Sequence, residues 1–369
     1  MRTIRNRLCT AGMASGMAVA EKGRSDLGKE VEEKLHEFIT YLKQKNPHSS
    51  YDVAKRTVLL LREVCSKTRW YSARDLITNI RAAGKKLIAA QPSESAVGNM
   101  VRRVLKIVRE EHASCVAGSV DEVDVRALLQ GRDDSDDLSR QTPHLKGSVI
   151  EIINDLLGEL ELSASNISSQ APDHIHSSEV LMTTGYSKTV EAFLKAAARK
   201  RKIEVIVAES APFYRGQELA KNLAVAGVET IVVTDSAVFA IMSRVNKVII
   251  GTHTVMADGS LKAINGSYAL CLAAKRHSVP VLVCAALFKL SPQYPCSYDH
   301  DTFNKIVSPH DILRFSEGQL VSKVHVQNPV FDHVPPDLIT LFVSNIGGNA
   351  PSYVYRLISE LYHPDDQEL

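Results

Sequence analysis

The sequence lacks the features that mark several classes of protein. No stretch of its 369 residues approaches the roughly 20 apolar residues that a membrane-spanning helix needs. None of its six cysteines forms a C-x-x-C pair, which disfavours a zinc ribbon or a redox motif. No G-x-G-x-x-G follows a predicted strand, which argues against a dinucleotide cofactor. We therefore expect no membrane segment, no metal and no cofactor.

Charge of a single sign is also missing. The 44 Lys and Arg residues nearly balance the 42 Asp and Glu residues, so the formal charge is only +2. A dedicated nucleic-acid binder usually carries a strongly basic balance, and we expect no direct nucleic-acid partner. With 44% hydrophobic and 23% charged residues, the composition is that of a globular protein long enough for two domains.

Two stretches do not fit a packed domain. In the leader, residues 1–25, the first 20 residues carry Arg2, Arg5 and Arg7 and no acid. The leader resembles a weak transit peptide or an extension ahead of a start at Met13 or Met17. We favour the extension and expect the leader to be disordered. A polar segment near 113–147 contains four aspartates between Asp133 and Asp137, and since like charges repel, we predict a mobile surface loop there.

The rest of the first half predicts helices. Apolar residues recur every three or four positions, and Ser93 or Ser95 can cap the helix that carries 97–108. Short links between these helices favour a bundle, so residues 26–162 are expected to form a helical domain. The apolar positions of the last helix, which we expect to face inward, are Val149, Ile152, Ile153, Leu156, Leu157 and Leu160.

The second half predicts an α/β fold. Near-continuous apolar runs at 180–182, 205–207, 231–233, 248–250, 281–283 and 338–343 alternate with helical segments. Such runs are typical of parallel strands that helices cover on both faces. Residues 163–369 are therefore expected to form a Rossmann-like, doubly wound parallel sheet, with Cys271 and Cys284 as buried, reduced thiols.

Functional residues of such a sheet lie after the carboxyl ends of its strands. One candidate is the segment Asn345, Gly347, Gly348 and Asn349, which precedes the last helix. Its glycines permit a tight turn, and its amides could hold an anion at the start of that helix. The alternative, which we favour, is a turn that positions the helix against a partner.

Several motifs in the second half resemble a known superfamily. Residues 209–216 (ESAPFYRG), the pair Asp258-Gly259 and residues 265–268 (NGSY) occur in the order found in sugar-phosphate isomerases and regulatory initiation-factor subunits. Longer segments are similar to the beta-subunit family of eukaryotic translation initiation factor two B: QPSESAVGNMVRRVLK at 91–106, MSRVNKVIIGT at 242–252, FKLSP at 288–292 and SNIGGNAPSY at 344–353.

This resemblance implies a binding role rather than catalysis. Members of the family are cytosolic, non-catalytic regulatory subunits in the guanine nucleotide exchange factor for initiation factor two. The factor is a decamer of alpha, beta, gamma, delta and epsilon subunits, and exchange activity belongs to epsilon, assisted by gamma. The implied partners are these sister subunits and the alpha subunit of initiation factor two, whose phosphorylation the regulatory core senses.

The same resemblance identifies a degenerate isomerase pocket. Thr184 stands where the isomerases have a catalytic Cys, and His253 stands where they have an Asp. Ala211 replaces the phosphate-binding Arg, and Ala263 replaces an Asn. Without a matched acid and base, a proton cannot be moved between sugar carbons. An active isomerase, or a metabolite sensor that uses the vestigial pocket, remains the alternative.

The helical domain offers a candidate partner surface. Arg102, Arg103 and Lys106 follow one another along its fourth predicted helix. They either face a partner or form a solvated helix face.

Overall fold

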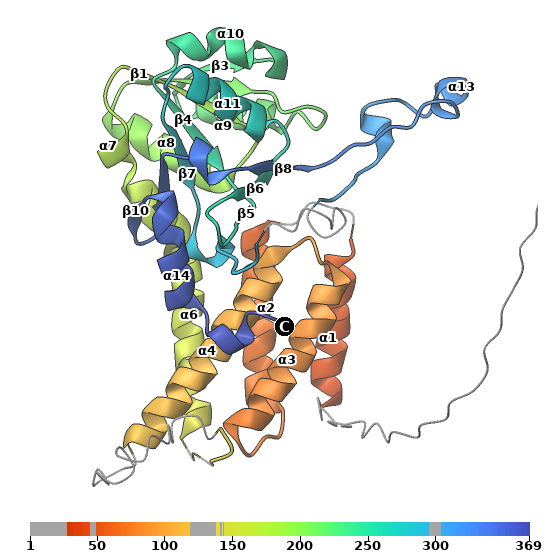
Figure 1. The fold of residues 1–369 in the computed structure, drawn as a ribbon, viewed down its shortest axis with the longest axis vertical. Helices are drawn as coiled ribbons and strands as arrows, with labels where there is room; N and C mark the ends of the chain where they lie inside the picture. The colour runs from red at the N-terminus through yellow and green to blue at the C-terminus, as the bar shows by residue number, and fades with distance from the viewer. Residues whose placement is uncertain (1–27, 45–48, 119–137, 141, 143, 295–303) are drawn as a thin grey trace, which may run out of the picture.

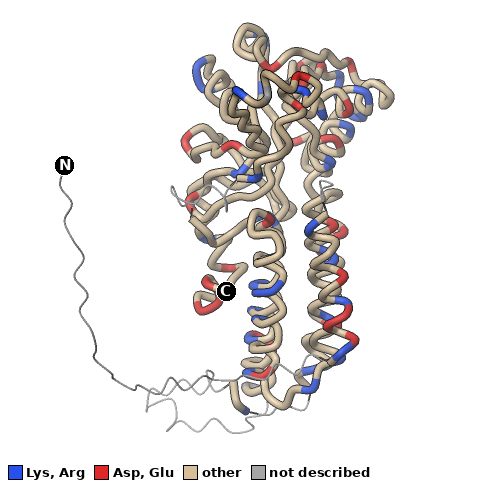
Figure 2. Tube along the Cα trace, turned by 90° about the vertical axis from the view of Figure 1, so that its right-hand side faces the viewer, with Lys and Arg blue, Asp and Glu red and all other residues tan. Residues whose placement is uncertain are grey.

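A computed structural model describes residues 28–44, 49–118, 138–140, 142, 144–294 and 304–369. The leader and the aspartate-rich run therefore lie outside the described residues. The described residues of 28–174 form a helical half and those of 179–369 form an α/β half, and the two lie one above the other in Figure 1 and in the turned view of Figure 2. This arrangement confirms the fold class predicted from the apolar patterns.

Among the described residues, five long helices form the helical half. Their apolar stripes face one another, and Ser72 starts the third with a capping box in which its hydroxyl accepts from the amide of Asp75. The fourth continues through residues that we expected in the loop. The helices are α1 (Lys29–Leu42), α2 (Ser50–Lys67), α3 (Ala73–Ala90), α4 (Ser95–Gly118) and α6 (Leu145–Ser169).

Helix α6 belongs to both halves. It packs against α2 and α4, and also against α8 (Lys188–Lys200) and β9 (Leu341–Ser344) of the α/β half. The boundary expected between residues 162 and 163 thus falls inside a continuous helix. Ile152, expected to face inward, is 36% exposed.

The main sheet has seven strands in the order β10-β9-β7-β4-β1-β2-β3. The six parallel strands read 3-2-1-4-5-6 in chain order, which is the doubly wound arrangement; β10 joins β9 in antiparallel register. The bounds are β1 (Glu179–Thr184), β2 (Ile203–Ala208), β3 (Glu229–Val233), β4 (Lys247–Gly251), β7 (Val281–Cys284) and β10 (Gly347–Asn349).

Helices cover this sheet, and a smaller sheet lies beside it (Figure 1). The smaller sheet, which the sequence analysis did not predict, is antiparallel, in the order β5-β6-β8. The helices and strands concerned are α7 (Ala171–His174), α9 (Arg215–Val225), α10 (Val238–Ile241), α11 (Ser267–Arg276), α14 (Val354–Leu361), β5 (Thr254–Val255), β6 (Leu261–Ile264) and β8 (Phe331–Val334).

Strand β3 differs from its prediction. Its apolar run indicated burial on both faces, yet β3 is an edge strand, with Ile231 40% and Val232 47% exposed. Adjacent strand residues point to opposite faces, so both faces of this edge carry apolar surface in water.

Candidate functional site

The structure gathers the four positions of the degenerate isomerase pocket around the carboxyl end of β1. Thr184 ends that strand, and a side chain on the next residue, Gly185, would meet Ile264 Cδ1 at 3.2 Å and Ser210 Oγ at 3.4 Å. Ile264 and Ser210 are the chain neighbours of Ala263 and Ala211. His253 joins the group because its amide donates to the carbonyl of Lys262 in β6 (2.9 Å).

A carboxylate of the chain itself lies beside Ala211. The amides of Ser210 and Ala211 donate to Asp235 Oδ1 and Oδ2 at 2.9 and 2.7 Å. Ala211 supplies no guanidinium that could hold a phosphate. This end of the group therefore carries a fixed negative charge and no cation at position 211.

His253 is held by the helical half. Its Nε2 lies 3.0 Å from Oε2 of Glu94, and its Nδ1 lies 3.1 Å from Oγ1 of Thr254. Glu94 is 8% exposed and precedes α4. Burial alone would raise the pKa of Glu94, but the charge and hydrogen bond of His253, the amide of Ala96 and the charge of Lys262 together hold it below its ordinary value.

Two lysines complete this buried polar cluster. Lys262 Nζ donates to the carbonyl of Ser93 (2.7 Å) and lies 4.8 Å from the centre of the Phe331 ring. Lys289 Nζ donates to the carbonyl of Thr252 (2.8 Å). Burial lowers the pKa of each lysine to about 8, against the opposing charge of Glu94.

The cluster joins the two halves of the chain. Thr254 Oγ1 donates to Ser95 Oγ (2.9 Å), and Asn99 Nδ2 donates to the carbonyl of Phe288 (3.0 Å). His253, which stands at a position matched to a catalytic residue, thus binds another part of the same chain. Sequence reasoning missed Glu94, Lys262 and Lys289; the available signals were the places of Glu94 and Lys289 in the matched segments at 91–106 and 288–292.

Of the three predicted partner-surface cations, Arg102 is placed differently from the prediction. It is 4% exposed, and its guanidinium donates to the carbonyls of Asp366 and Gln367 in the C-terminal tail. Asp366 is itself fully buried between Arg81 and Arg109. Arg102 therefore secures the tail and does not face a partner.

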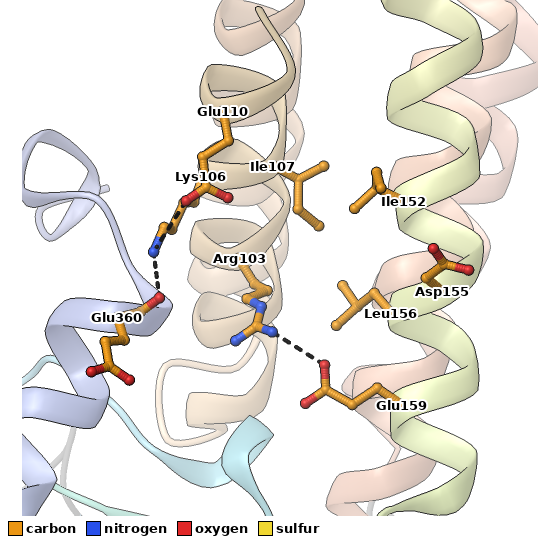
Figure 3. Close-up of a pocket in the computed structure, with 9 residues that line it drawn as sticks. All are labelled: Arg103, Lys106, Ile107, Glu110, Ile152, Asp155, Leu156, Glu159 and Glu360. Atoms are coloured by element: carbon orange, nitrogen blue, oxygen red, sulfur yellow. Dashed lines mark hydrogen bonds and ion pairs between the residues drawn. The ribbon is translucent and has the colours of Figure 1, made fainter. Parts of the chain in front are cut away.

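Arg103 and Lys106 line a groove of about 250 Å³ between α4, α6 and the end of α14 (Figure 3). Arg103 Nη2 lies 3.1 Å from Glu159 Oε2, and Lys106 pairs with Glu110 at 3.4 Å and with the carbonyl of Glu360. Both cations are thus already paired. The lining holds four carboxylates against two cations over an apolar floor of Ile107, Ile152 and Leu156.

Asn345 and Ile346 form the turn of a hairpin between β9 and β10, and Gly347–Asn349 are β10 itself. Asn345 Oδ1 accepts from the amide of Leu287 (3.0 Å), and Asn349 Nδ2 donates to the carbonyl of Gly347 (3.2 Å). Gly347 has φ +136°, which only glycine adopts readily, and Gly348 lies in the exposed edge strand. Helix α14 begins five residues after Asn349, beyond a 3₁₀ turn, so these amides do not form its start.

The described residues show neither a metal-ligand cluster nor a membrane-spanning helix. No group of three or more His, Cys, Asp or Glu side chains in the described ranges is placed to hold a metal ion. No helix among the described segments is long and apolar enough to cross a membrane.

Comparison with known proteins decides the family. The model of the initiation factor 2 subunit family matches residues 43–351. This chain belongs to the initiation factor 2 subunit family.

Two relatives that align over most of the chain are beta subunits. The translation initiation factor eIF2B subunit beta of Dictyostelium discoideum is 44% identical and aligns over 89% of this chain and 95% of its own. The corresponding subunit of Schizosaccharomyces pombe is 36% identical over the same shares. A ribose 1,5-bisphosphate isomerase of Archaeoglobus fulgidus is more distant, at 30% identity over 58% of this chain and 67% of its own.

Solved structures of eIF2B subunits have the same fold as this chain. The eIF2B beta of Chaetomium thermophilum superposes with a TM-score of 0.73 at 28% identity, covering 92% of this chain and 94% of that one. A chain of the tetrameric eIF2B-beta2-delta2 complex from the same organism gives a TM-score of 0.69 at 28% identity, covering 90% and 95%. The resemblance read from the motifs is confirmed, and the chain is a non-catalytic member of the family.

Proposed function

We propose that this chain is a regulatory subunit of the guanine nucleotide exchange factor for translation initiation factor two. It acts in the cytosol, assembled with alpha, delta, gamma and epsilon subunits, and couples phosphorylation of the factor's alpha subunit to nucleotide exchange. One observation carries the proposal: at positions that the resemblance assigns to an isomerase pocket, His253 and the amides of Ser210 and Ala211 bind the chain's own Glu94 and Asp235. What remains for the scaffold is binding.

The apolar edge of the main sheet supports contact with a sister subunit. Ile231 and Val232 of β3 are exposed, as are Val225 (82%) at the end of α9 and Phe239 (57%) in α10. These elements lie together at the end of the α/β half that is farthest from the helical half (Figure 1). An unprotected apolar edge strand invites pairing with another chain, and a similar solved chain comes from a complex with delta.

The groove of Figure 3 supports contact with the alpha subunit of initiation factor two. Its four carboxylates exceed its two cations, and Asp155 has no ion pair among the described residues. A basic, partly apolar segment of the partner would complement this lining. Phosphorylation of that segment would add about −1.5 to −2 charge and repel it, so the population would shift to another binding mode.

Co-expression tests the proposal. The full-length chain, tagged and expressed with the alpha, gamma, delta and epsilon subunits, should retain all four and support nucleotide release from initiation factor two. Phosphorylated factor should slow that release. Purified alone, the chain should leave ribose-1,5-bisphosphate and methylthioribose-1-phosphate unchanged. Turnover of either sugar phosphate, or a complex that forms fully without this chain, would refute the proposal.

The groove has its own test. Asp155→Lys should weaken binding of the unphosphorylated factor about tenfold while the sister subunits stay bound. Glu161→Lys, an exposed change on the same helix outside the groove, is the control. Equal binding by the two variants would exclude the groove.

A further inference from the structure

The C-terminal tail, residues 363–369, lies against the helical half although it follows α14 of the α/β half (Figure 1). The residue before the tail is held on its own half, since the buried hydroxyl of Tyr362 donates to the carbonyl of Leu290 (2.6 Å). Within the tail, Asp366 alone is fully buried, and four of the other six residues are exposed. The tail is therefore attached to the helical half mainly through one side chain and the carbonyls beside it.

Three arginines of the helical half receive Asp366, and we call them the arginine site. Arg81 comes from α3, and Arg102 and Arg109 come from α4. The carboxylate of Asp366 lies 2.5 Å from Arg81 Nη2 and 2.9 Å from Arg109 Nε. Arg102 Nε and Nη2 donate to the carbonyl of Gln367 at 3.1 and 2.9 Å. All of these donors belong to the helical half, and in these contacts the tail contributes only acceptors.

The charges of the arginine site require an acidic occupant. Within the described ranges, the ion pairs of the three arginines are with Asp365 and Asp366 of the tail and with no other acid. Arg81 Nε is buried and has no hydrogen-bond partner there, so the site keeps an unused donor. Without the tail, three guanidinium groups would remain close together with no anion among them, which is costly for buried charges. A carboxylate-bearing segment fits this arrangement, because guanidinium groups bind carboxylates through charge-assisted hydrogen bonds.

The contacts of the arginine site are of the kind by which proteins bind acidic peptides. Clusters of arginines recognise a negatively charged anchor side chain on a short segment of chain. Here Asp366 is the anchor, and Arg102 binds the main-chain carbonyls of Asp366 and Gln367. We propose that the arginine site is a binding site for short acidic peptides, which the chain's own tail occupies in cis. The tail is thus an autoinhibitory ligand that excludes the acidic segments of other molecules from α3 and α4.

Competition on the wild-type, full-length chain tests the proposal. The probe is a synthetic peptide of residues 363–369 (HPDDQEL) at millimolar concentration, because a tail tethered in cis has an effective concentration of about that size. The peptide should displace the tail, so that hydrogen exchange of the tail, read by mass spectrometry, becomes several-fold faster. The same peptide with Asp366→Asn should leave the exchange unchanged, since it lacks the charge of the anchor. Equal exchange with and without the unaltered peptide would overturn the proposal.

Direct binding of the labelled peptide gives a second measurement. The full-length variant Asp366→Ala lacks the anchor in cis, so it should bind the peptide at least tenfold more tightly than the wild type does. Asp365→Ala removes a carboxylate that is 61% exposed and should bind the peptide as the wild type does. Circular dichroism checks that both variants are folded, and the competition experiment decides if Asp366→Ala is not. Equal binding by the two folded variants would show that the tail is a structural strap and overturn the proposal.

Discussion

Replacing the carboxylate of Asp366 by an amide is expected to cause the largest loss of folding stability of any change to one functional group. Its carboxylate is fully buried, 2.5 Å from Arg81 Nη2 and 2.9 Å from Arg109 Nε. Burial would raise the pKa of Asp366, but hydrogen bonds from Arg109 and Arg81 outweigh it and hold the pKa below its ordinary value. Asp366→Asn keeps the shape and removes the charge. Breaking such a pair costs about 3 kcal/mol, near the low end for buried pairs because Arg81 is 36% exposed.

The assay is urea unfolding of the isolated chain at pH 7, followed by circular dichroism. Asp365→Asn is the matched control, because that carboxylate is 61% exposed and 3.8 Å from Arg109, so its loss should cost under about 0.5 kcal/mol. The pKa of Asp366 is lower in the folded chain than in the unfolded chain, where it is about 3.9, so its ionised carboxylate stabilises the fold at pH values above about 3.9. This stabilisation is lost as the pH falls through the folded-state pKa. The variant should therefore lose part of the wild type's acid sensitivity. Equal unfolding midpoints for the two variants would refute the reasoning.

Three further predictions concern buried groups. In the wild type, the free energy of unfolding should rise between about pH 8 and 10.4, because over that range the unfolded chain holds a proton that the native Lys262 has lost. Lys262→Met should flatten this rise by up to about 1.4 kcal/mol per pH unit, measured by urea unfolding across the range. An unchanged slope would contradict the burial of the ammonium group. His112 is buried, and neither of its ring nitrogens has a hydrogen-bond partner among the described residues. His112→Leu should therefore raise the free energy of unfolding by about 1 kcal/mol relative to the control His36→Leu on an exposed helix face. An equal effect of the two changes would contradict this cost of burying His112. Cys65, Cys271 and Cys284 should resist alkylation in the native chain at pH 8, as read by mass spectrometry of their peptides, because burial raises the pKa of each thiol to about 12; rapid labelling would show that the core opens.

Local pattern predicted the elements of this fold but not all of their neighbours. The apolar runs identified each parallel strand, and their alternation with helices identified the sheet type. The exposure of Ile231 and Val232 depends on which strand lies at the edge, and an apolar run carries no information on that order. The strands of the smaller sheet have two to four residues, too few to show a period.

The same limit applies to the site. Thr184, Ala211, His253 and Ala263 were located through matched motifs, and the structure places them around one strand end. Arg102 looked exposed because its neighbours on the helix are charged, whereas its actual partners lie more than 260 residues further along the chain. Glu94 likewise meets His253 only through the fold. Contacts at such separations are properties of the tertiary structure, and spacing along a helix does not encode them.

Helix α6 fixes the two halves of the chain to each other. Its 25 residues form a continuous rod about 37 Å long. Its contacts with α2 run from Lys146 through Asn154 to Glu161, and it also packs against α8 and β9. The two halves therefore share one unbroken element, with no loop at their boundary.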